Sequence, residues 1–243
     1  MTTLRFDLLA GRVHATPWDA HVNEGQVEWP PSPWRLIRAL IAASWRTPDL
    51  DRPAARALIL RLADHLPIYH LPPVTFSHTR AYLAQLGSGG GKMVFDAFAA
   101  TDHTAGHEPS LHVTWPDHTL SVDEHRLLTR ILPHVGYLGR AEAWVEARLD
   151  SPPSEAPHAW PADEPGHHTH PMWAPIESHA WDAWRAGWLA AGGAKKLLPA
   201  DRWEALSHET LHLHKAAWST PPGSRRVPRS EEHTSELQSP CNL

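Results

Sequence analysis

The sequence predicts an α+β fold in which helices cover one face of an antiparallel sheet, with insertions between the elements. Residues 3–9 alternate apolar with polar side chains, a period-two pattern typical of a half-buried strand. Pro33–Arg46 carries apolar residues at helical spacing on one side. Residues 68–149 then add several short strand patterns around one more helix, which favours a mixed layer of sheet and helices.

Three helices are expected, and each follows a residue that can cap it with a side-chain oxygen. They are Pro33–Arg46 after Ser32, a segment that runs from Asp51 to before Pro67, and a segment that runs from Ser121 to before Pro133. Proline in the first turn, at Pro33 and Pro53, suits positions where no backbone amide partner is needed.

After the first strand, further strands are expected at 68–71, 74–80, 92–100, 111–115 and 143–149. The strands at 74–80 and 92–100 can form a hairpin around the glycine run at 87–91. With the helix after Asp51 taken as an insertion, the order is strand, helix, strands, helix, strand. This is the order of a ferredoxin-like unit, which we expect over residues 1–150.

The remaining chain divides by composition. Residues 151–175 are rich in Pro and His and show no apolar period, so we expect a linker or an exposed insertion. Residues 176–228 carry Trp181, Trp184 and Trp188 at helical spacing, which predicts a partly helical segment with these rings on a buried face.

The formal net charge of −5 argues against a generally basic coat for nucleic acid, although a local basic face stays possible. The single cysteine, Cys241, allows no internal disulfide, which fits a reducing cytoplasm. No signal peptide and no membrane-spanning run is visible. We therefore expect a cytoplasmic protein that does not act at a membrane.

Two long blocks point to a family. Gly11–Leu40 reads GRVHATPWDAHVNEGQVEWPPSPWRLIRAL, and Gly136–Leu149 reads GYLGRAEAWVEARL. Together they resemble the CRISPR-associated RAMP proteins of type I-U (I-G) systems, in which a five-like and a six-like Cas unit are fused. The resemblance implies a RAMP or RRM-like ferredoxin fold. It also implies a surveillance-complex subunit that holds the 5′ handle of CRISPR RNA in antiviral defence, with other Cascade-type subunits as partners.

In that family the six-like half cuts the repeat transcript. For the portion present we expect RNA binding and complex assembly rather than chemistry, with no cofactor. The alternative is a metal-independent endoribonuclease in which His14 or His21 serves as general acid or base against the RNA 2′-hydroxyl. Both imidazoles can equally hold their loop by hydrogen bonds.

The RNA contacts expected from the sequence come from four places. Arg35 and Arg38 share the polar side of the first helix, where a guanidinium can grip phosphate or simply be solvated. In GYLGR, Tyr137 can stack on a base, Gly139 allows close approach and Arg140 can contact RNA, although a tight turn would need the same glycines. Lys92 can reach RNA from the hairpin, but GSGGGK lacks the order of a phosphate loop.

The cluster of His167, His168 and His170 can attract a transition metal, but without a thiolate or an HExxH helix we expect no metal site. RSEEHTSELQS at Arg229–Ser239 matches the translation of a common sequencing-adapter oligonucleotide. We therefore expect residues 229–243 to be foreign to the protein, although a natural polar tail fits the composition equally well. We also expect the second RAMP domain, which would follow residue 228, to be missing.

Overall fold

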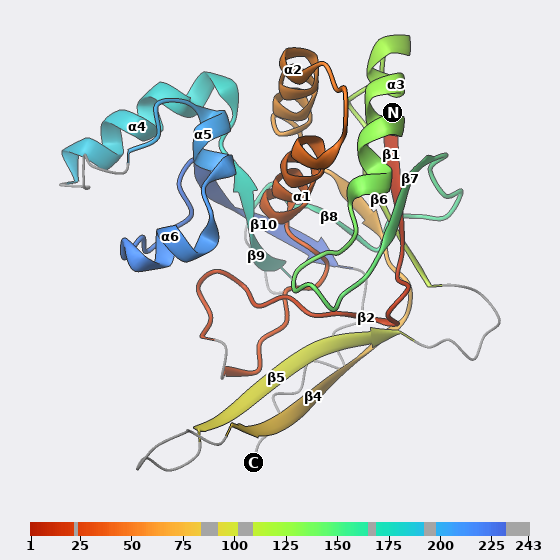
Figure 1. Ribbon diagram of the computed structural model, residues 1–243, viewed down its shortest axis with the longest axis vertical. Helices are drawn as coiled ribbons and strands as arrows, with labels where there is room; N and C mark the ends of the chain where they lie inside the picture. The colour runs from red at the N-terminus through yellow and green to blue at the C-terminus, as the bar shows by residue number, and fades with distance from the viewer. Residues whose placement is uncertain (22–23, 84–91, 102–108, 165–168, 192–197, 232–243) are drawn as a thin grey trace.

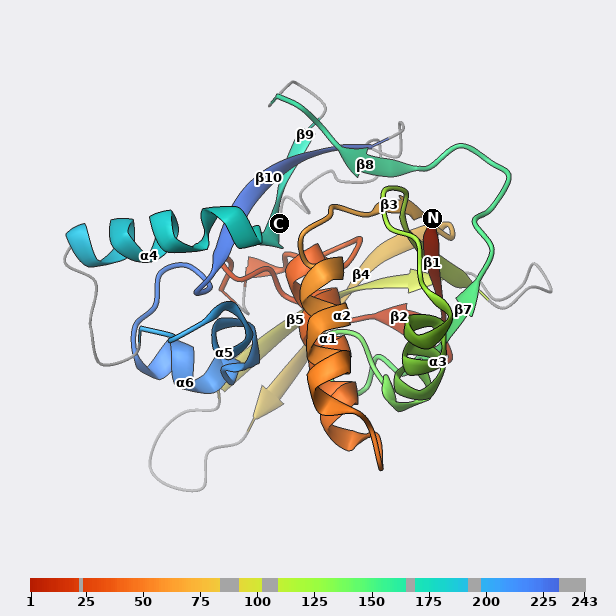
Figure 2. The ribbon, with the colours of Figure 1, turned by 90° about the horizontal axis from the view of Figure 1, so that it is seen from above.

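The computed structural model describes residues 1–21, 24–83, 92–101, 109–164, 169–191 and 198–231. In this part of the chain the strands form a seven-stranded sheet in the order β7-β1-β6-β3-β8-β10-β9 and a three-stranded sheet in the order β2-β5-β4. Figure 2 shows α1, α2 and α3 together on one side of the larger sheet. The predicted α+β class, with an antiparallel sheet and helices on one face, is confirmed.

The first part of the larger sheet is compatible with a ferredoxin-like arrangement. Its elements in chain order are β1 (Thr2–Asp7), α1 (Pro33–Arg46), β3 (Ile68–His70), β6 (Ser110–Trp115), α3 (Val122–Ile131) and β7 (Glu146–Asp150). Because β6 is antiparallel to both β1 and β3, these two strands run parallel with β6 between them. By the same logic β6 and β7 run parallel with β1 between them, so the two strand-helix-strand units interleave.

The helix starts follow the predicted caps. The Ser32 hydroxyl accepts a hydrogen bond from the Arg35 amide at 3.3 Å, and Asp51 accepts one from the Ala54 amide at 3.0 Å ahead of α2 (Arg52–Leu62). Ser121 and Glu124 form a reciprocal capping box at α3. The helix that begins after Asp51 is an insertion between α1 and β3, as expected.

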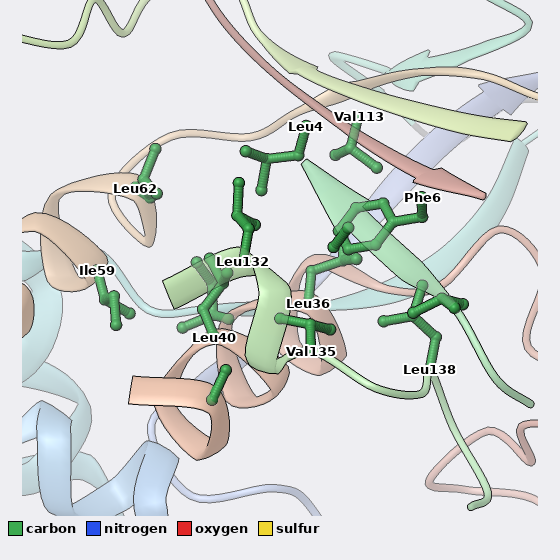
Figure 3. Close-up of a cluster of buried hydrophobic side chains, with 14 of the residues drawn as sticks. Leu4, Phe6, Leu36, Leu40, Ile59, Leu62, Val113, Leu132, Val135 and Leu138 are labelled. Atoms are coloured by element: carbon green, nitrogen blue, oxygen red, sulfur yellow. The ribbon is translucent and has the colours of Figure 1, made fainter. Parts of the chain in front are cut away.

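The core lies between the larger sheet and α1 to α3. Figure 3 shows Leu4 and Phe6 of β1 in one buried cluster with Leu36 and Leu40 of α1, and each of the four is at most 2% exposed. Full burial of a side chain of this size contributes about 1.5–3 kcal/mol. This cluster therefore fixes the position of α1 against the sheet, and with it the position of the end of the loop that precedes α1.

The strand at 74–80 and its partner are longer than expected and belong to the smaller sheet. β4 (Val74–Leu83) and β5 (Lys92–Thr101) pair along their whole length, and β2 (Arg12–Val13) adds to the base of β5. Figure 1 shows this hairpin projecting away from the helices. The hairpin prediction is correct, and the glycine run at 87–91 lies outside the described residues.

The segment at 151–175 differs from the expected linker. It contains β8 (Ala159–Pro161) and β9 (Thr169–Pro175), and both belong to the larger sheet. Ala159 pairs with Tyr69 of β3, and residues 169–175 pair with β10 (Ser224–Glu231). These ladders use main-chain groups, so a Pro- and His-rich composition without apolar alternation does not reveal them.

The segment at 176–228 is partly helical, as expected, and ends in β10. It contains α4 (Trp181–Ala190), α5 (Arg202–Ser207) and α6 (Thr210–Lys215), while short 3-10 turns lie at Leu132–His134 (η2) and Ser178–Ala180 (η3). Trp181 is buried, but Trp184 and Trp188 are only half-buried and stack along α4. No helix in the described part of the chain is both long and apolar enough to cross a bilayer.

The face of the larger sheet opposite the helices is charged. On β1, side chains alternate so that Arg5 and Asp7 point away from Leu4 and Phe6. Asp7 forms ion pairs with Arg5 and with Arg148 of β7. His112 of β6 lies on the same face, where its Nε2 is 3.5 Å from a carboxylate oxygen of Asp150.

The last described residues hold the two parts of the sheet together. All three register pairs between β10 and β8 come from Arg229, Ser230 and Glu231, which lie in the segment that resembles adapter translation. Ending the chain after Pro228 should therefore remove these pairs with β8, together with the Arg229–His170 and Ser230–Thr169 pairs with β9. With about 0.5–1.5 kcal/mol for each hydrogen bond lost, the thermal unfolding midpoint should fall by a few degrees.

The matched control ends after Glu231, which keeps the three pairs and removes only residues 232–243. Its midpoint, measured by circular dichroism, should stay within about 2 °C of the full chain. An equal midpoint for the two shortened chains would show that the pairs made by residues 229–231 contribute no stability.

Stability should also depend on pH through His112. Burial lowers the pKa of His112, Asp150 opposes this, and the charges of Arg5 and His70 lower it further. The unfolded chain therefore takes up this proton at a higher pH than the folded chain, so stabilisation is present above about pH 6.5 and is lost as the pH falls below that value. His112→Gln should make the stability profile between about pH 7 and pH 5 shallower, as measured by urea unfolding.

The control for His112 is the exposed His125 of α3, replaced in the same way. Its profile should match that of the parent chain. A His112→Gln profile as steep as the parent's would contradict the assignment of this loss to His112.

Candidate functional site

The loop that follows β1 and the turn that precedes β7 lie against each other. His14 forms an isolated parallel bridge with Gly139, and the Arg140 amide donates a hydrogen bond of 2.8 Å to the His14 carbonyl oxygen. The two blocks that carried the family resemblance are separated by 95 residues in the sequence, and they meet here in the fold. The pattern of residues in either block does not by itself predict this juxtaposition.

Gly139 is required where the two blocks meet. Its φ is +91°, which side-chain-bearing residues rarely adopt, and a Cβ atom at this position would lie 2.4 Å from the His14 carbonyl oxygen. Both the backbone conformation and the close approach exclude a larger residue. Gly139 thus permits the turn and allows the His14 backbone to lie close to it. The group that Gly139 accommodates here is a protein backbone and not a ligand.

The His14 side chain is held between two carboxylates. Its Nδ1 is 2.8 Å from Glu142 Oε1, and its Nε2 is 3.7 Å from Asp96 Oδ1 on β5. The ring also lies against Phe98, and the residue is only 5% exposed. His14 therefore connects the loop, the turn and the hairpin.

The charge state of Glu142 favours this role. Burial by itself would raise the pKa of Glu142, but hydrogen bonds from its own backbone amide and from His14, with the charges of His14 and Arg140, bring it below its ordinary value. An ionised Glu142 accepts, so the His14 Nδ1 donates. With both ring nitrogens facing carboxylates, the imidazole is placed to position its neighbours rather than to exchange protons with a bound strand.

Arg140 adds a second connection from the turn to the hairpin. One of its terminal nitrogens lies 2.8 Å from Asp96 Oδ1, and about a third of the side chain stays exposed. Asp96 thereby receives a cation from the turn and faces the imidazole from the loop. The guanidinium keeps exposed donors at the edge of this ion pair, so Arg140 stays more accessible than Arg35, whose side chain is 22% exposed.

Two aromatic side chains stand exposed on the turn. Tyr137 and Trp144 face each other in an antiparallel bridge and are 41% and 61% exposed. Directly opposed residues point their side chains to the same side. Leu138 between them is fully buried, and its amide donates to the Ala143 carbonyl, which anchors the turn. Tyr137 and Trp144 therefore present two exposed rings on one side of the turn, and we call this pair the aromatic platform.

Arg35 does not lie on an open helix face. Its Nε and one terminal nitrogen bond the two carboxylate oxygens of Glu28 at 2.7 and 3.0 Å, and it also donates to the Thr16 carbonyl. Burial alone would raise the pKa of Glu28, but Arg35 and the hydrogen bond from Ser32 lower it. Arg35 therefore anchors the loop to α1 through a fork-shaped ion pair.

Arg38 is also committed to the protein. Its guanidinium lies over the Trp34 ring at 4.5 Å and donates to the Leu206 carbonyl at 2.7 Å, which connects α1 to α5. Burial, and then the charge of Arg35, lower its pKa to about 10, so it remains a cation at neutral pH. Its place in the fold favours a structural role over phosphate contact.

The other predicted residues lie apart from this cluster or outside what the structure describes. His21 is exposed further along the loop. Lys92 pairs with Leu83 near the hairpin tip, but its side chain lies outside the described part. His167 and His168 also lie outside it, while His170 is in β9. Within the described ranges, no group of three His, Cys, Asp or Glu could hold a metal ion.

Three residues of the site were not singled out from the sequence. Asp96 is a lone carboxylate in an apolar strand, a pattern that indicates a cationic partner within the protein. Glu142 follows Arg140 by two residues in the turn. Trp144 was assigned to the last strand because it continues that strand's alternation. The turn delays the strand, which begins at Glu146, and leaves Trp144 exposed.

Comparison with protein-family models and with curated proteins found no match for this chain. The functional reading of the site therefore depends on its own geometry and on the resemblance of its two blocks.

Proposed function

We propose that this protein binds single-stranded RNA through the aromatic platform and Arg140, and that in the cell this strand is the 5′ handle of CRISPR RNA. The surrounding assembly would be a cytoplasmic type I-U (I-G) surveillance complex. The observation that carries the proposal is the meeting of the two resembling blocks at His14 and Gly139, with Tyr137 and Trp144 exposed beside them. Exposed aromatic rings bind unpaired bases by stacking.

The charges around the platform suggest how such binding would work. Arg140 is paired with Asp96, and Glu142 adds a further negative charge. With these charges, the surface by itself would not neutralise several phosphates. Stacking would supply most of the affinity, and neighbouring subunits would supply most of the phosphate contacts, so the isolated chain should bind RNA with a shallow salt dependence.

The platform gives a direct test. Tyr137→Ala and Trp144→Ala should each weaken binding of a fluorescein-labelled, unstructured RNA of about twelve nucleotides, because each removes a stacking surface. The loss of about 1–3 kcal/mol per stacked base corresponds to roughly five- to 150-fold in affinity. Fluorescence anisotropy measures it.

The matched control is Trp45→Ala at the end of α1, because Trp45 is 59% exposed but belongs to a different part of the surface, beside Arg52. Its affinity should stay within about twofold of the parent. No binding by the parent chain, or an equal loss in all three variants, would sink the proposal.

His14 separates the binding proposal from the ribonuclease alternative. His14→Ala leaves Glu142 without its imidazole partner, so we expect a loss of about 1.5–3 kcal/mol in the free energy of unfolding, measured with urea. RNA incubated with the parent chain in EDTA should remain intact on a denaturing gel. Cleavage by the parent that disappears in His14→Ala would instead establish the ribonuclease.

A further inference from the structure

A second feature lies on the other face of the hairpin. A cavity of about 570 Å³ opens between the loop before α1, strands β4 and β5, and strands β9 and β10. Figure 1 shows these segments gathered on the side of the molecule where the hairpin projects. The volume falls in the range of small-ligand sites and is large enough for one nucleotide.

The cavity and the platform are separated by the hairpin. Side chains on β5 alternate between its two faces, so Asp96 and Phe98 point towards His14 and Arg140, while Phe95 and Ala97 line the cavity. A strand that crosses the hairpin edge can therefore contact both. This arrangement was not anticipated from the sequence, because the loop, the hairpin and β9–β10 are far apart along the chain.

Flat π surfaces line the cavity on two sides. On the hairpin side the His78 ring stacks on Phe95 at 4.7 Å. On the β9–β10 side the Arg226 guanidinium lies over the Trp173 ring at 4.9 Å. Aromatic rings and guanidinium planes are the surfaces on which unstacked bases are held in proteins that bind single-stranded RNA.

The charges of the cavity are nearly balanced. Arg226 is paired with Asp19, and Glu28 is paired with Arg35. This balance does not suit a polyphosphate, which would need several unpaired cations. It suits a neutral aromatic base. The Arg226 side chain is 46% exposed, so it can meet a phosphate at the mouth of the cavity.

Contact between the loop and the hairpin closes one wall. Gly25 has a φ of +68°, and a Cβ atom there would lie 2.5 Å from the Phe95 ring. A residue with a side chain would push the loop and the ring apart. The glycine thus allows the loop to lie directly against the Phe95 ring on this side of the cavity.

We propose that this cavity takes one unstacked nucleobase of the bound strand, held between the His78–Phe95 side and the Trp173–Arg226 side. This inference extends the proposed function and rests on it for the identity of the strand. It adds a site with a distinct prediction, because a base that enters a cavity occupies one defined position in the RNA, whereas stacking on an exposed platform tolerates a change of register.

The test is a scan in which each position of the unstructured RNA is replaced in turn by an abasic nucleotide. With the parent chain, the abasic nucleotide at one position should lower affinity by roughly five- to 150-fold, the range for one lost stacked base. Two variants should remove this dependence to within about twofold: Phe95→Ala, which deletes a stacking ring, and Ala97→Trp, which fills the cavity. The control is Ala183→Trp on the exposed side of α4, which should behave like the parent.

The outcomes separate the two proposals. RNA binding with no sensitive position, or with the same sensitivity in Ala97→Trp, overturns the cavity while the platform stands. If the parent chain binds no RNA, the proposed function fails, and the cavity is then decided by calorimetric titration with adenosine, cytidine, guanosine and uridine monophosphates. Binding of any of them that Ala97→Trp abolishes supports the cavity, and binding of none, or binding unaffected by Ala97→Trp, overturns it.

Discussion

Leu36 and Leu40 of α1 pack with Leu4 and Phe6 of β1 in the main core, and the position of the candidate site follows from that contact. The helix cannot rotate without exposing this apolar face, so Ser32 and Arg35 at its start are fixed in space. Arg35 then holds Glu28, and with it the end of the loop. The packing of α1 on the core thus fixes the end of the loop, and the Arg35–Glu28 ion pair fixes a point within it.

Three arginines connect segments that lie far apart in the sequence or in different elements of the fold. Arg35, Arg140 and Arg226 each form an ion pair with a carboxylate in a different loop or strand of the protein. Ion pairs of this kind contribute modestly to stability, but they give the loop, the turn and the hairpin defined positions. The surface that results carries few unpaired cations, so the proposed recognition of RNA depends on aromatic side chains rather than on charge.

The hairpin of β4 and β5 organises the region by separating two environments. One face of β5 presents Asp96 to the imidazole and guanidinium of the loop and the turn. The other face presents Phe95 to the cavity. A two-stranded ribbon is not stable alone, so the contacts that define the site and the cavity also help to hold the hairpin in place.

Much of the fold could be predicted from local pattern. The strand at β1, the caps Ser32, Asp51 and Ser121, and the insertion helix all follow from short-range chemistry, because alternation and capping involve neighbouring residues. Strands β8 and β9 could not be predicted. They pair through main-chain groups with partners distant in sequence, and a Pro- and His-rich composition gives no signal of such pairing.

For the candidate site, the sequence by itself determined which residue types are present: a glycine able to adopt positive φ, a neighbouring tyrosine, and histidines in an early loop. Only the tertiary structure decided their partners. In the folded protein His14 lies between Glu142 and Asp96, and Arg35 and Arg38 form contacts within the protein. Phe95 lines a cavity. The reason is physical: conformational preference depends on adjacent residues, whereas the partner of a charge or a ring is set by the packing of elements that the sequence keeps far apart.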